Sequence, residues 1–536
     1  MVSSTASSSS WPVIIPTLLL CYFVSWAVYN LWFHPLAKVP GPFLARISRL
    51  PTFYHAVKGD RHIWLSQCHR IYGSKVRVQP NEAIFLSQQA HRDIYGFKAN
   101  VRRSKSYKAW QTSADPNTAL TIDPASHSRK RKILNQAFTE KSVKNAASFV
   151  MQHTDRWIDL IVADEDIVNE GGWSKSRDMS NWTNWLIFDI LGDICFGRSF
   201  EIKEPGPNPI RAIPELVQNH VLFFYPILQS PIMEFFVWAK PKGIDSLLNM
   251  IAPPELKTYY KFINDSVTQR MQMEKEIKPN EESSRRDMFH YLCAARDPVT
   301  NEPYSEDALQ GEAAMLIVAG SDSTASILAA FWFYISRNQT AYERIITEIR
   351  STFHSADEIV SGAKLQSCVY LWACIEECLR ISPAGPSEFA REVLPGGATI
   401  DGDYYPPGVL VGCAHFAMGR NEAIFGDPDR FRPERYIPSE ETGVTIEDVH
   451  RLKAYYQPFL IGPTNCVGQN IAMMEMALVI AKTLFRLDVR SVPGEDLGAG
   501  HPSLGVGRRD KDQYQIVDAF ITVHSGPVVQ FRKRSI

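Results

Sequence analysis

The chain has 536 residues, of which 45% are hydrophobic, so it can bury a large core. Its 57 basic and 58 acidic residues give a formal net charge of -1, which argues against nucleic acid as a main partner. The nine cysteines are scattered and include no Cys-x-x-Cys pair, so the sequence indicates neither a disulfide framework nor a zinc site. No linker or repeat divides the chain after residue 45, and we expect one large folded unit.

The N-terminal region predicts a membrane anchor. Residues 11–33 carry no charge, and this length can cross a bilayer core of roughly 30 Å at about 1.5 Å per residue. Residues 1–10 would form a short lumenal tail. Lys38, Arg46 and Arg49 follow the anchor, so the positive-inside rule puts the rest of the chain in the cytosol. A cleaved signal peptide is the alternative, but the basic segment that normally begins one is missing.

The body after Val39-Pro-Gly-Pro42, a stiff non-helical exit, shows mostly helical periodicity. Alternation typical of strands is confined to residues 75–86, 391–411 and 520–531. The fold class is therefore helix-dominated α+β with small peripheral sheets. Residues 221–238 are too apolar for an ordinary surface loop. They predict either a core-packed helix pair or a lip that dips into the membrane.

A cluster of polar residues interrupts an apolar helix predicted over residues 311–330. Residues 319–324 read Ala-Gly-Ser-Asp-Ser-Thr, and their polar groups are costly to bury unless each finds a partner. A hydroxyl bonded to its own backbone opens a helix locally, and Gly320 leaves room beside the opening. The pattern predicts a groove next to a polar relay. A capped helix that starts at Ser321 is the weaker alternative.

Three charged residues further along suggest a buried ion network. Glu377 and Arg380 share one face of an apolar helix because they are three residues apart. Buried pairs of this kind more often fix geometry than supply net stability. Arg435 could join the pair.

One cysteine lies in a loop suited to the close approach of a ligand. The loop runs Phe459-Leu-Ile-Gly462-Pro-Thr-Asn-Cys466-Val-Gly468 and precedes an apolar helix that starts at Gln469. The glycines would let the backbone pass close to a large flat ligand, while the proline stiffens the loop. Backbone N–H groups at the start of the helix would stabilise the sulfur as an anion, the form that binds a metal.

Together, the anchor, the Pro-Gly-Pro exit and these motifs resemble the cytochrome P450 family of haem-thiolate monooxygenases, in particular the microsomal enzymes of filamentous fungi. The resemblance runs from the anchor to the last strand, with the landmarks in the family's order. It implies a helix-rich, mainly α (α+β) fold with small peripheral sheets after one transmembrane helix. It assigns residues 34–536 to the catalytic domain.

The resemblance also implies which residues hold the cofactor, haem b. Cys466 would be the axial thiolate ligand of the iron. Phe459, Gly462 and Gly468 would shape the loop around it. His127, Arg131 and Arg391 match the positions that bind the haem propionates.

Further roles follow from the same resemblance. Asp322 and Ser323 match the acid–alcohol pair that relays protons during oxygen activation, and Thr324 could share this work. Glu377, Arg380 and Arg435 match a buried triad that is structural rather than catalytic.

Thr464 departs from the family pattern, which has a basic residue two positions before the cysteine. That residue normally pairs with a propionate through a charge-assisted bond. A threonine hydroxyl can still donate a hydrogen bond, but we expect haem to be lost more easily. The substitution Thr464→Arg should slow its dissociation.

The resemblance implies that one atom of O2 enters the substrate while the other leaves as water. No Gly-x-Gly-x-x-Gly fingerprint or flavin module is evident, so the electrons would come from an NADPH-dependent flavoprotein reductase on the same membrane. Residues 127–131 open a basic helix, on which we expect Arg129 and Lys130 to form a solvated face. The stretch 129–132 is where an acidic partner could dock. The expected location is the endoplasmic reticulum membrane, spanned once, with the catalytic domain in the cytosol.

The expected substrate is a lipophilic small molecule, such as a terpenoid, polyketide or alkaloid intermediate of fungal secondary metabolism. The pocket walls would come from the segment around Trp110, from residues 383–389 and from the final hairpin. Two other functions stay open. One is a haem-thiolate isomerase or dehydratase that needs no O2, against which the Asp322–Ser323 pair argues. The other is a non-catalytic haem-binding or lipid-carrying membrane protein.

Overall fold

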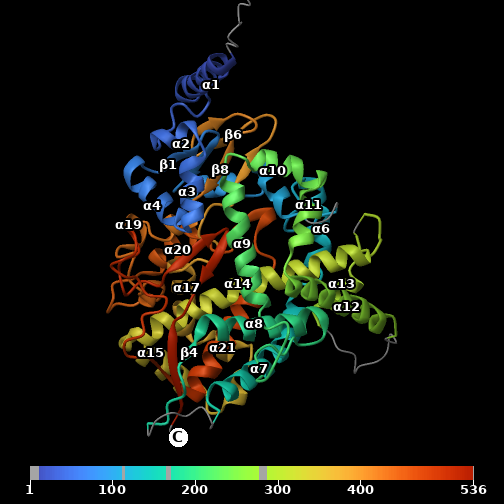
Figure 1. The fold of residues 1–536 in the computed structure, drawn as a ribbon. Coiled ribbons are helices and arrows are strands. Elements are labelled where there is room, and N and C mark those ends of the chain that lie inside the picture. Colours follow the sequence, from blue (N-terminus) through green and yellow to red (C-terminus); the bar gives the residue numbers. More distant parts are fainter. Residues whose placement is uncertain (1–10, 112–114, 164–170, 277–286, 298, 535–536) are drawn as a thin grey trace, which may run out of the picture.

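Helices dominate the fold, as predicted, and surround one long central helix (Figure 1). The computed structural model describes residues 11–111, 115–163, 171–276, 287–297 and 299–534, so the predicted lumenal tail lies outside the described residues. The helices are α1 (Trp11–Val28), α2 (Phe43–Ile47), α3 (Leu50–Lys58), α4 (Arg61–Tyr72), α5 (Gln88–Tyr95), α6 (Pro124–Asn135), α7 (Glu140–Ile161), α8 (Met179–Phe196), α9 (Ile213–Gln229), α10 (Met233–Ala239), α11 (Ile244–Ile251), α12 (Pro254–Glu276), α13 (Met288–Ala294), α14 (Glu306–Arg337), α15 (Gln339–Thr352), α16 (Ala363–Gln366), α17 (Val369–Ile381), α18 (His415–Met418), α19 (Glu422–Phe425), α20 (Ile446–Tyr455) and α21 (Gln469–Arg486).

The strands form small sheets at the periphery. They are β1 (Lys75–Gln79), β2 (Glu82–Phe85), β3 (Val101–Arg103), β4 (Arg177–Asp178), β5 (Arg391–Val393), β6 (Ala398–Ile400), β7 (Asp403–Tyr405), β8 (Leu410–Cys413), β9 (Leu487–Ser491), β10 (Ile516–Ala519), β11 (Ile521–His524) and β12 (Val528–Lys533). The largest sheet has the order β1-β2-β8-β5-β3, and only its β2–β8 pair is parallel. The remaining sheets are β4-β12-β9, β10-β11 and β6-β7.

The three regions of predicted strands all contain strands, which confirms the helix-dominated class with small sheets. The sequence pattern missed β3, β4 and β9, and it placed the start of the last strand region after β10. Two of these are only two or three residues long, too short for alternation to show. The third, β9, follows directly on α21 and is paired by the distant β12.

The central helix α14 begins at the Ser305 cap, whose side chain accepts a hydrogen bond from the Ala308 N–H. From Ala325 to Ile335 every side chain is buried, because α14 packs against α8, α12, α17 and α21. The helix continues through residues 319–324, so the alternative of a helix start at Ser321 is wrong. The expected interruption does not end the helix either. Packing on several sides holds this segment helical.

The apolar helix predicted at residues 11–33 is present as α1 and a π-helical turn, Tyr29–Phe33. Two helices of the described chain are long and apolar enough to cross a membrane, Ile14–Phe33 and α14. Of these, α14 lies in the core, whereas α1 projects from the body (Figure 1). Arg77 of β1 fixes the end of the anchor, because it donates to the backbone carbonyl of Asn30 at 2.7 Å.

The chain exit after the anchor packs directly on the body. The Arg77 N–H donates to the Pro40 carbonyl at 2.7 Å. A Cβ at Gly41 would lie 2.1 Å from the Arg77 carbonyl oxygen, so this close approach requires glycine. The Pro-Gly-Pro segment therefore docks the anchor onto β1.

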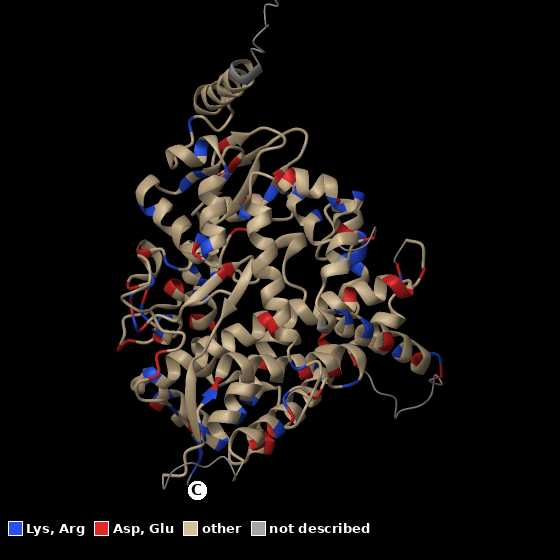
Figure 2. Cartoon of the chain, in the orientation of Figure 1, with Lys and Arg blue, Asp and Glu red and all other residues tan. Residues whose placement is uncertain are grey.

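The apolar segment at residues 221–238 forms a helix pair with one face packed on the core, as one interpretation predicted. The lip that dips into the membrane stays a prediction. Helices α9 and α10 are bent by 113° at a short break. The inner face, with Phe224 and Leu228, is buried, whereas Phe235 and Trp238 are exposed. Charges of both signs are scattered over the rest of the body, and α1 carries none (Figure 2).

Candidate functional site

The loop that carries Cys466 closes on itself before α21 begins. The Cys466 N–H donates to the Phe459 carbonyl at 2.8 Å. Burial raises the pKa of the Cys466 thiol, while N–H groups of Gly468 and Gln469 and the charge of Arg131 partly offset the rise. The Cys466 side chain is nevertheless exposed to solvent. Protein therefore surrounds the thiol on most sides and leaves it open on one, with anion-stabilising groups beside it.

The glycines of this loop differ in what they do. Gly462 has a φ of +70°, and a Cβ there would lie 2.1 Å from the Tyr95 carbonyl oxygen. The close contact with α5 therefore explains why residue 462 is glycine. From the sequence alone, this glycine was expected to provide the space that a ligand needs. At Gly468 a Cβ would lie 3.9 Å from the Cys466 Sγ, an ordinary contact, so the described neighbours alone do not require glycine.

Four basic side chains gather near this loop, and we call them the cationic cluster: Arg103, His127, Arg131 and Arg391. Burial and the charges of the three arginines lower the pKa of His127 to about 3, so the four groups lie within electrostatic reach of one another. Arg103 donates to the neutral His127 ring at 3.3 Å. Arg131 donates to the backbone carbonyl of Asn465 at 2.6 Å, next to the thiol.

Strand pairing forces two of these arginines together. Arg103 of β3 lies directly opposite Arg391 of β5, and both are buried. Like charges opposite each other destabilise a sheet, and burial lowers the pKa of Arg103 to about 10. Within the described part of the chain, no carboxylate forms an ion pair with any member of the cluster. The cluster therefore fits a ligand that brings its own carboxylates, as haem does.

Thr464 belongs to the same region. Arg391 donates to the Thr464 hydroxyl at 3.0 Å and to the Phe389 carbonyl at 2.8 Å. The hydroxyl thus serves as an acceptor that orients Arg391. Its own proton is still available to a ligand.

Sequence reasoning missed Arg103 and misjudged Lys130. Arg102 and Arg103 are adjacent, and only the strand register shows that Arg102 pairs with Glu392 while Arg103 turns inward. Lys130, expected on a solvated face, is buried and donates to Asp115 and to the Pro116 carbonyl. The expectation was wrong because the loop before α6 folds over this side of the helix.

The predicted relay residues lie midway along α14. Ser323 donates to the Ala319 carbonyl at 2.6 Å, the back-bond that the motif predicted. Ala319 is exposed although much of the helix around it is buried. Asp322 and Thr324 are buried, and Ser323 is half-buried. The helix therefore presents one open position next to a hydroxyl and an acid.

Asp322 is a buried acid without a cation. Burial raises its pKa to about 7, and the Gln218 side chain partly offsets the rise. Neither of its oxygens makes a well-formed hydrogen bond to another described residue. A second buried acid, Glu475 of α21, was not predicted, and burial raises its pKa to about 8. The Thr324 side chain partly offsets that rise, which places Glu475 beside the polar part of α14. This part of the helix therefore contains one buried acid, Asp322, and lies next to a second, and both have raised pKa values.

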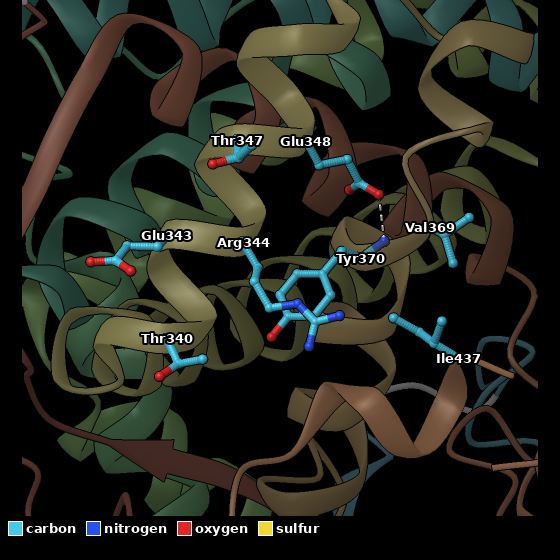
Figure 3. Close-up of a pocket in the computed structure, with 8 residues that line it drawn as sticks. All are labelled: Thr340, Glu343, Arg344, Thr347, Glu348, Val369, Tyr370 and Ile437. Atoms are coloured by element: carbon cyan, nitrogen blue, oxygen red, sulfur yellow. Dashed lines mark hydrogen bonds between the residues drawn. The ribbon is translucent and has the colours of Figure 1, made fainter. Parts of the chain in front are cut away.

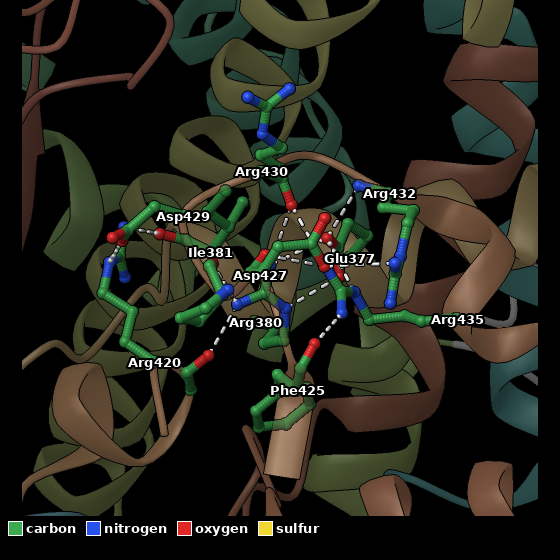
Figure 4. A network of polar contacts seen from close by, with 12 residues as sticks. Glu377, Arg380, Ile381, Arg420, Phe425, Asp427, Asp429, Arg430, Arg432 and Arg435 are labelled. Carbon is green, nitrogen blue, oxygen red and sulfur yellow. Dashed lines mark hydrogen bonds and ion pairs between the residues drawn. The ribbon is translucent and has the colours of Figure 1, made fainter. Parts of the chain in front are cut away.

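The structure brings Glu377, Arg380 and Arg435 together as an ion triad (Figure 4). Arg380 donates to both carboxylate oxygens of Glu377, at 2.8 and 2.7 Å, and Arg435 donates at 3.1 Å. All three side chains are almost fully buried. The arginines also donate to backbone carbonyls of the segment 419–430, so the triad holds that segment on α17.

The expected pocket walls converge on Phe520, between β10 and β11. Its ring lies 6.4 Å from that of Trp110 and 5.5 Å from that of Phe389, centroid to centroid. Trp110 also contacts Phe224 of α9 at 5.9 Å. Three segments distant in sequence therefore form one aromatic cluster that contacts α9.

A surface pocket of about 510 Å³ lies elsewhere, between α15 and the start of α17 (Figure 3). Glu348 in it accepts hydrogen bonds from the backbone N–H groups of Tyr370 and Leu371, at 2.8 and 2.9 Å. This carboxylate caps α17 and so has a structural explanation. None of the predicted site residues lines the pocket.

Comparison with known proteins matches the whole body of the chain to one family. The family model for cytochrome P450 matches residues 40–512. Cytochrome P450 monooxygenase AKT7 of Alternaria alternata is 34% identical over 526 residues, covering 97% of both chains. Cytochrome P450 monooxygenase poxM of Penicillium oxalicum is 34% identical over 96% of this chain and 93% of its own. Cytochrome P450 monooxygenase fscF of Fusarium equiseti is 34% identical over 98% and 97%. The chain therefore belongs to the cytochrome P450 family and is a haem-thiolate monooxygenase related to those of fungi.

Proposed function

We propose that this monooxygenase is anchored in the endoplasmic reticulum membrane and oxidises a lipophilic intermediate of fungal secondary metabolism. Haem b would be held on Cys466. The observation that carries the assignment is the cationic cluster, which lacks a carboxylate partner in the described chain and lies beside the open thiol. The isomerase or dehydratase and the non-catalytic alternative are not favoured by the family relationship.

The cationic cluster would bind the two propionates. Arg391 and Arg103 face each other across paired strands, and Arg131 reaches the cysteine loop through Asn465. A negative charge raises the pKa of His127, so the ring would gain a proton as an anion approaches. The ring nitrogen that does not contact Arg103 could then donate to that anion. When bound, haem supplies the chemistry that activates O2.

The protein's own part in oxygen activation would be to supply protons. With a pKa of about 7, Asp322 can both hold and release a proton at neutral pH. Ser323 can pass one on if its hydroxyl turns away from the Ala319 carbonyl. We propose Asp322 as the proton source, Ser323 as the relay, and Thr324 with Glu475 as a secondary route.

The substrate would arrive from the membrane. Helices α2, α3 and α10 lie at the same end of the molecule as α1 (Figure 1). Their exposed apolar residues include Phe43, Leu44, Leu50, Phe235 and Trp238. The aromatic cluster around Phe520, which contacts α9, would bind a lipophilic ligand. This arrangement supports a single-pass anchor with the body dipping into the cytosolic leaflet.

Electrons would come from an NADPH-dependent flavoprotein reductase. Arg129 and Lys132 of α6 are exposed, and Arg131 links the same helix to the cysteine loop. An acidic partner docked here would lie close to the thiolate. The rate of reduction should then fall as salt rises.

The test uses the full-length protein in membranes with a flavoprotein reductase, NADPH and a panel of terpenoids, polyketides and alkaloids. The proposal expects NADPH- and O2-dependent products that gain one oxygen atom from labelled O2. Products that form without O2 or NADPH would contradict it. Cys466→Ala serves as the control that should abolish turnover.

A further inference from the structure

A single buried carboxylate on α14 holds the loop at residues 115–121. Glu312 Oε1 accepts hydrogen bonds from the Thr118 N–H at 2.7 Å and from the Thr118 hydroxyl at 2.6 Å. Both residues are buried, with 2% and 3% of their surfaces exposed. A buried carboxylate that accepts two bonds from one residue fixes both its backbone and its side chain.

The same loop is also tied to the cationic cluster. Arg103 donates to the Thr121 carbonyl at 2.8 Å while contacting the His127 ring. Lys130 holds the other end through Asp115 and the Pro116 carbonyl. The loop thus connects α14 with the cations that are expected to bind the propionates.

Helix geometry places this attachment on the side of α14 that opens at Ala319. Glu312 precedes Ala319 by about two turns and Ser323 by about three, so all three lie on nearly the same face. The rise per residue puts Glu312 about 10 Å from Ala319 along the axis. The loop therefore contacts the same face of α14, about two turns before the open position at Ala319.

We propose that Glu312 is a positioning residue that clamps the 115–121 loop onto the ligand-facing side of α14 and so limits the size of ligand the site admits. The inference rests on the proposed function, which makes this face the one next to the haem. A carboxylate is not essential for the clamp, because a glutamine oxygen can accept both bonds from Thr118. A leucine of similar volume cannot.

The first test measures binding of imidazole and of the bulkier 4-phenylimidazole to the ferric holoenzyme by their Soret shifts. In Glu312→Leu the preference for the bulky ligand should rise about tenfold over wild type, while Glu312→Gln stays within about twofold. Asp307→Leu, at the exposed start of the same helix, is the control and should change nothing. An unchanged preference in Glu312→Leu, or an equal change in the control, overturns the proposal.

A second readout needs no haem ligand. Hydrogen exchange of the peptide spanning residues 115–121 should be faster in Glu312→Leu and unchanged in Glu312→Gln. If Glu312→Leu does not fold, Thr118→Val removes only the hydroxyl bond and should give a smaller change in the same direction. Unchanged exchange in the foldable variant contradicts the clamp. Absence of any Soret shift in wild type would instead count against the proposed function.

Discussion

Two buried arginine clusters in this protein have opposite electrostatic designs. In the ion triad, Arg380 and Arg435 share the carboxylate of Glu377, and backbone carbonyls take up their remaining donors. In the cationic cluster, Arg103 and Arg391 lie opposite each other with no carboxylate partner in the described chain. The first cluster is complete in itself. The second is complete only with an anion, and this separates a structural ion network from a binding site.

Removing the Glu377 carboxylate should have the largest effect, because it is the counter-ion that the two buried arginines share. Glu377→Ala leaves buried Arg380 without a counter-ion and Arg435 with only Asp427, at 3.5 Å, and should lower the free energy of unfolding by about 3–5 kcal/mol. Denaturant unfolding of the solubilised protein measures this. Glu376→Ala is the control, since Glu376 pairs with Lys453 at the surface and should cost under about 1 kcal/mol. Equal losses in both variants would show that the triad is not special.

Asp322 is the reverse case, a buried acid without a cation. Its pKa is raised from 3.8 to about 7, so the folded state binds the proton more tightly than the unfolded state does. Its contribution to the free energy of unfolding is therefore highest below about pH 4 and falls as the pH rises through 7. Wild type should therefore lose about 2 kcal/mol relative to Asp322→Asn between pH 5 and pH 7. Unfolding free energies of both proteins across this range check it. A difference that does not change with pH would mean that Asp322 is not a perturbed acid.

In the cationic cluster, removing a charge should harm the haem complex and spare the apoprotein. Arg103→Gln should speed haem transfer to a scavenging globin about tenfold. Apoprotein stability should change little, because relief of the repulsion from Arg391 offsets the lost hydrogen bond to the Thr121 carbonyl. Arg102→Gln, one residue away and paired with Glu392, is the matched control with unchanged transfer. A loss of apoprotein stability in Arg103→Gln would make Arg103 structural.

The smallest expected effect is at Thr464. Thr464→Arg adds a cation beside Arg391 and should slow haem transfer a few-fold, while lowering apoprotein stability slightly through repulsion. Thr464→Val is the opposite variant: it removes the hydroxyl acceptor that orients Arg391 and should speed haem transfer. Haem loss that does not differ among the three proteins would remove Thr464 from the site.

The ion pair of the triad could be predicted from sequence because Glu377 and Arg380 are neighbours on one helix, where spacing fixes geometry. The helix-rich class also followed from periodicity. Arg103 could not be found this way, because the choice between it and Arg102 depends on a strand register set by residues almost 300 positions away. The burial of Lys130 was hidden for a local reason, because it depends on how the irregular loop before α6 folds over the helix.

Cys466 would present a thiolate to haem held by the cationic cluster. The most direct measurement is the carbon monoxide difference spectrum of the reduced full-length protein in membranes. Thiolate ligation by Cys466 should give the strongly red-shifted Soret band of a thiolate-ligated ferrous complex, lost in Cys466→Ala. A band typical of a neutral axial ligand, or one that survives in Cys466→Ala, would contradict it.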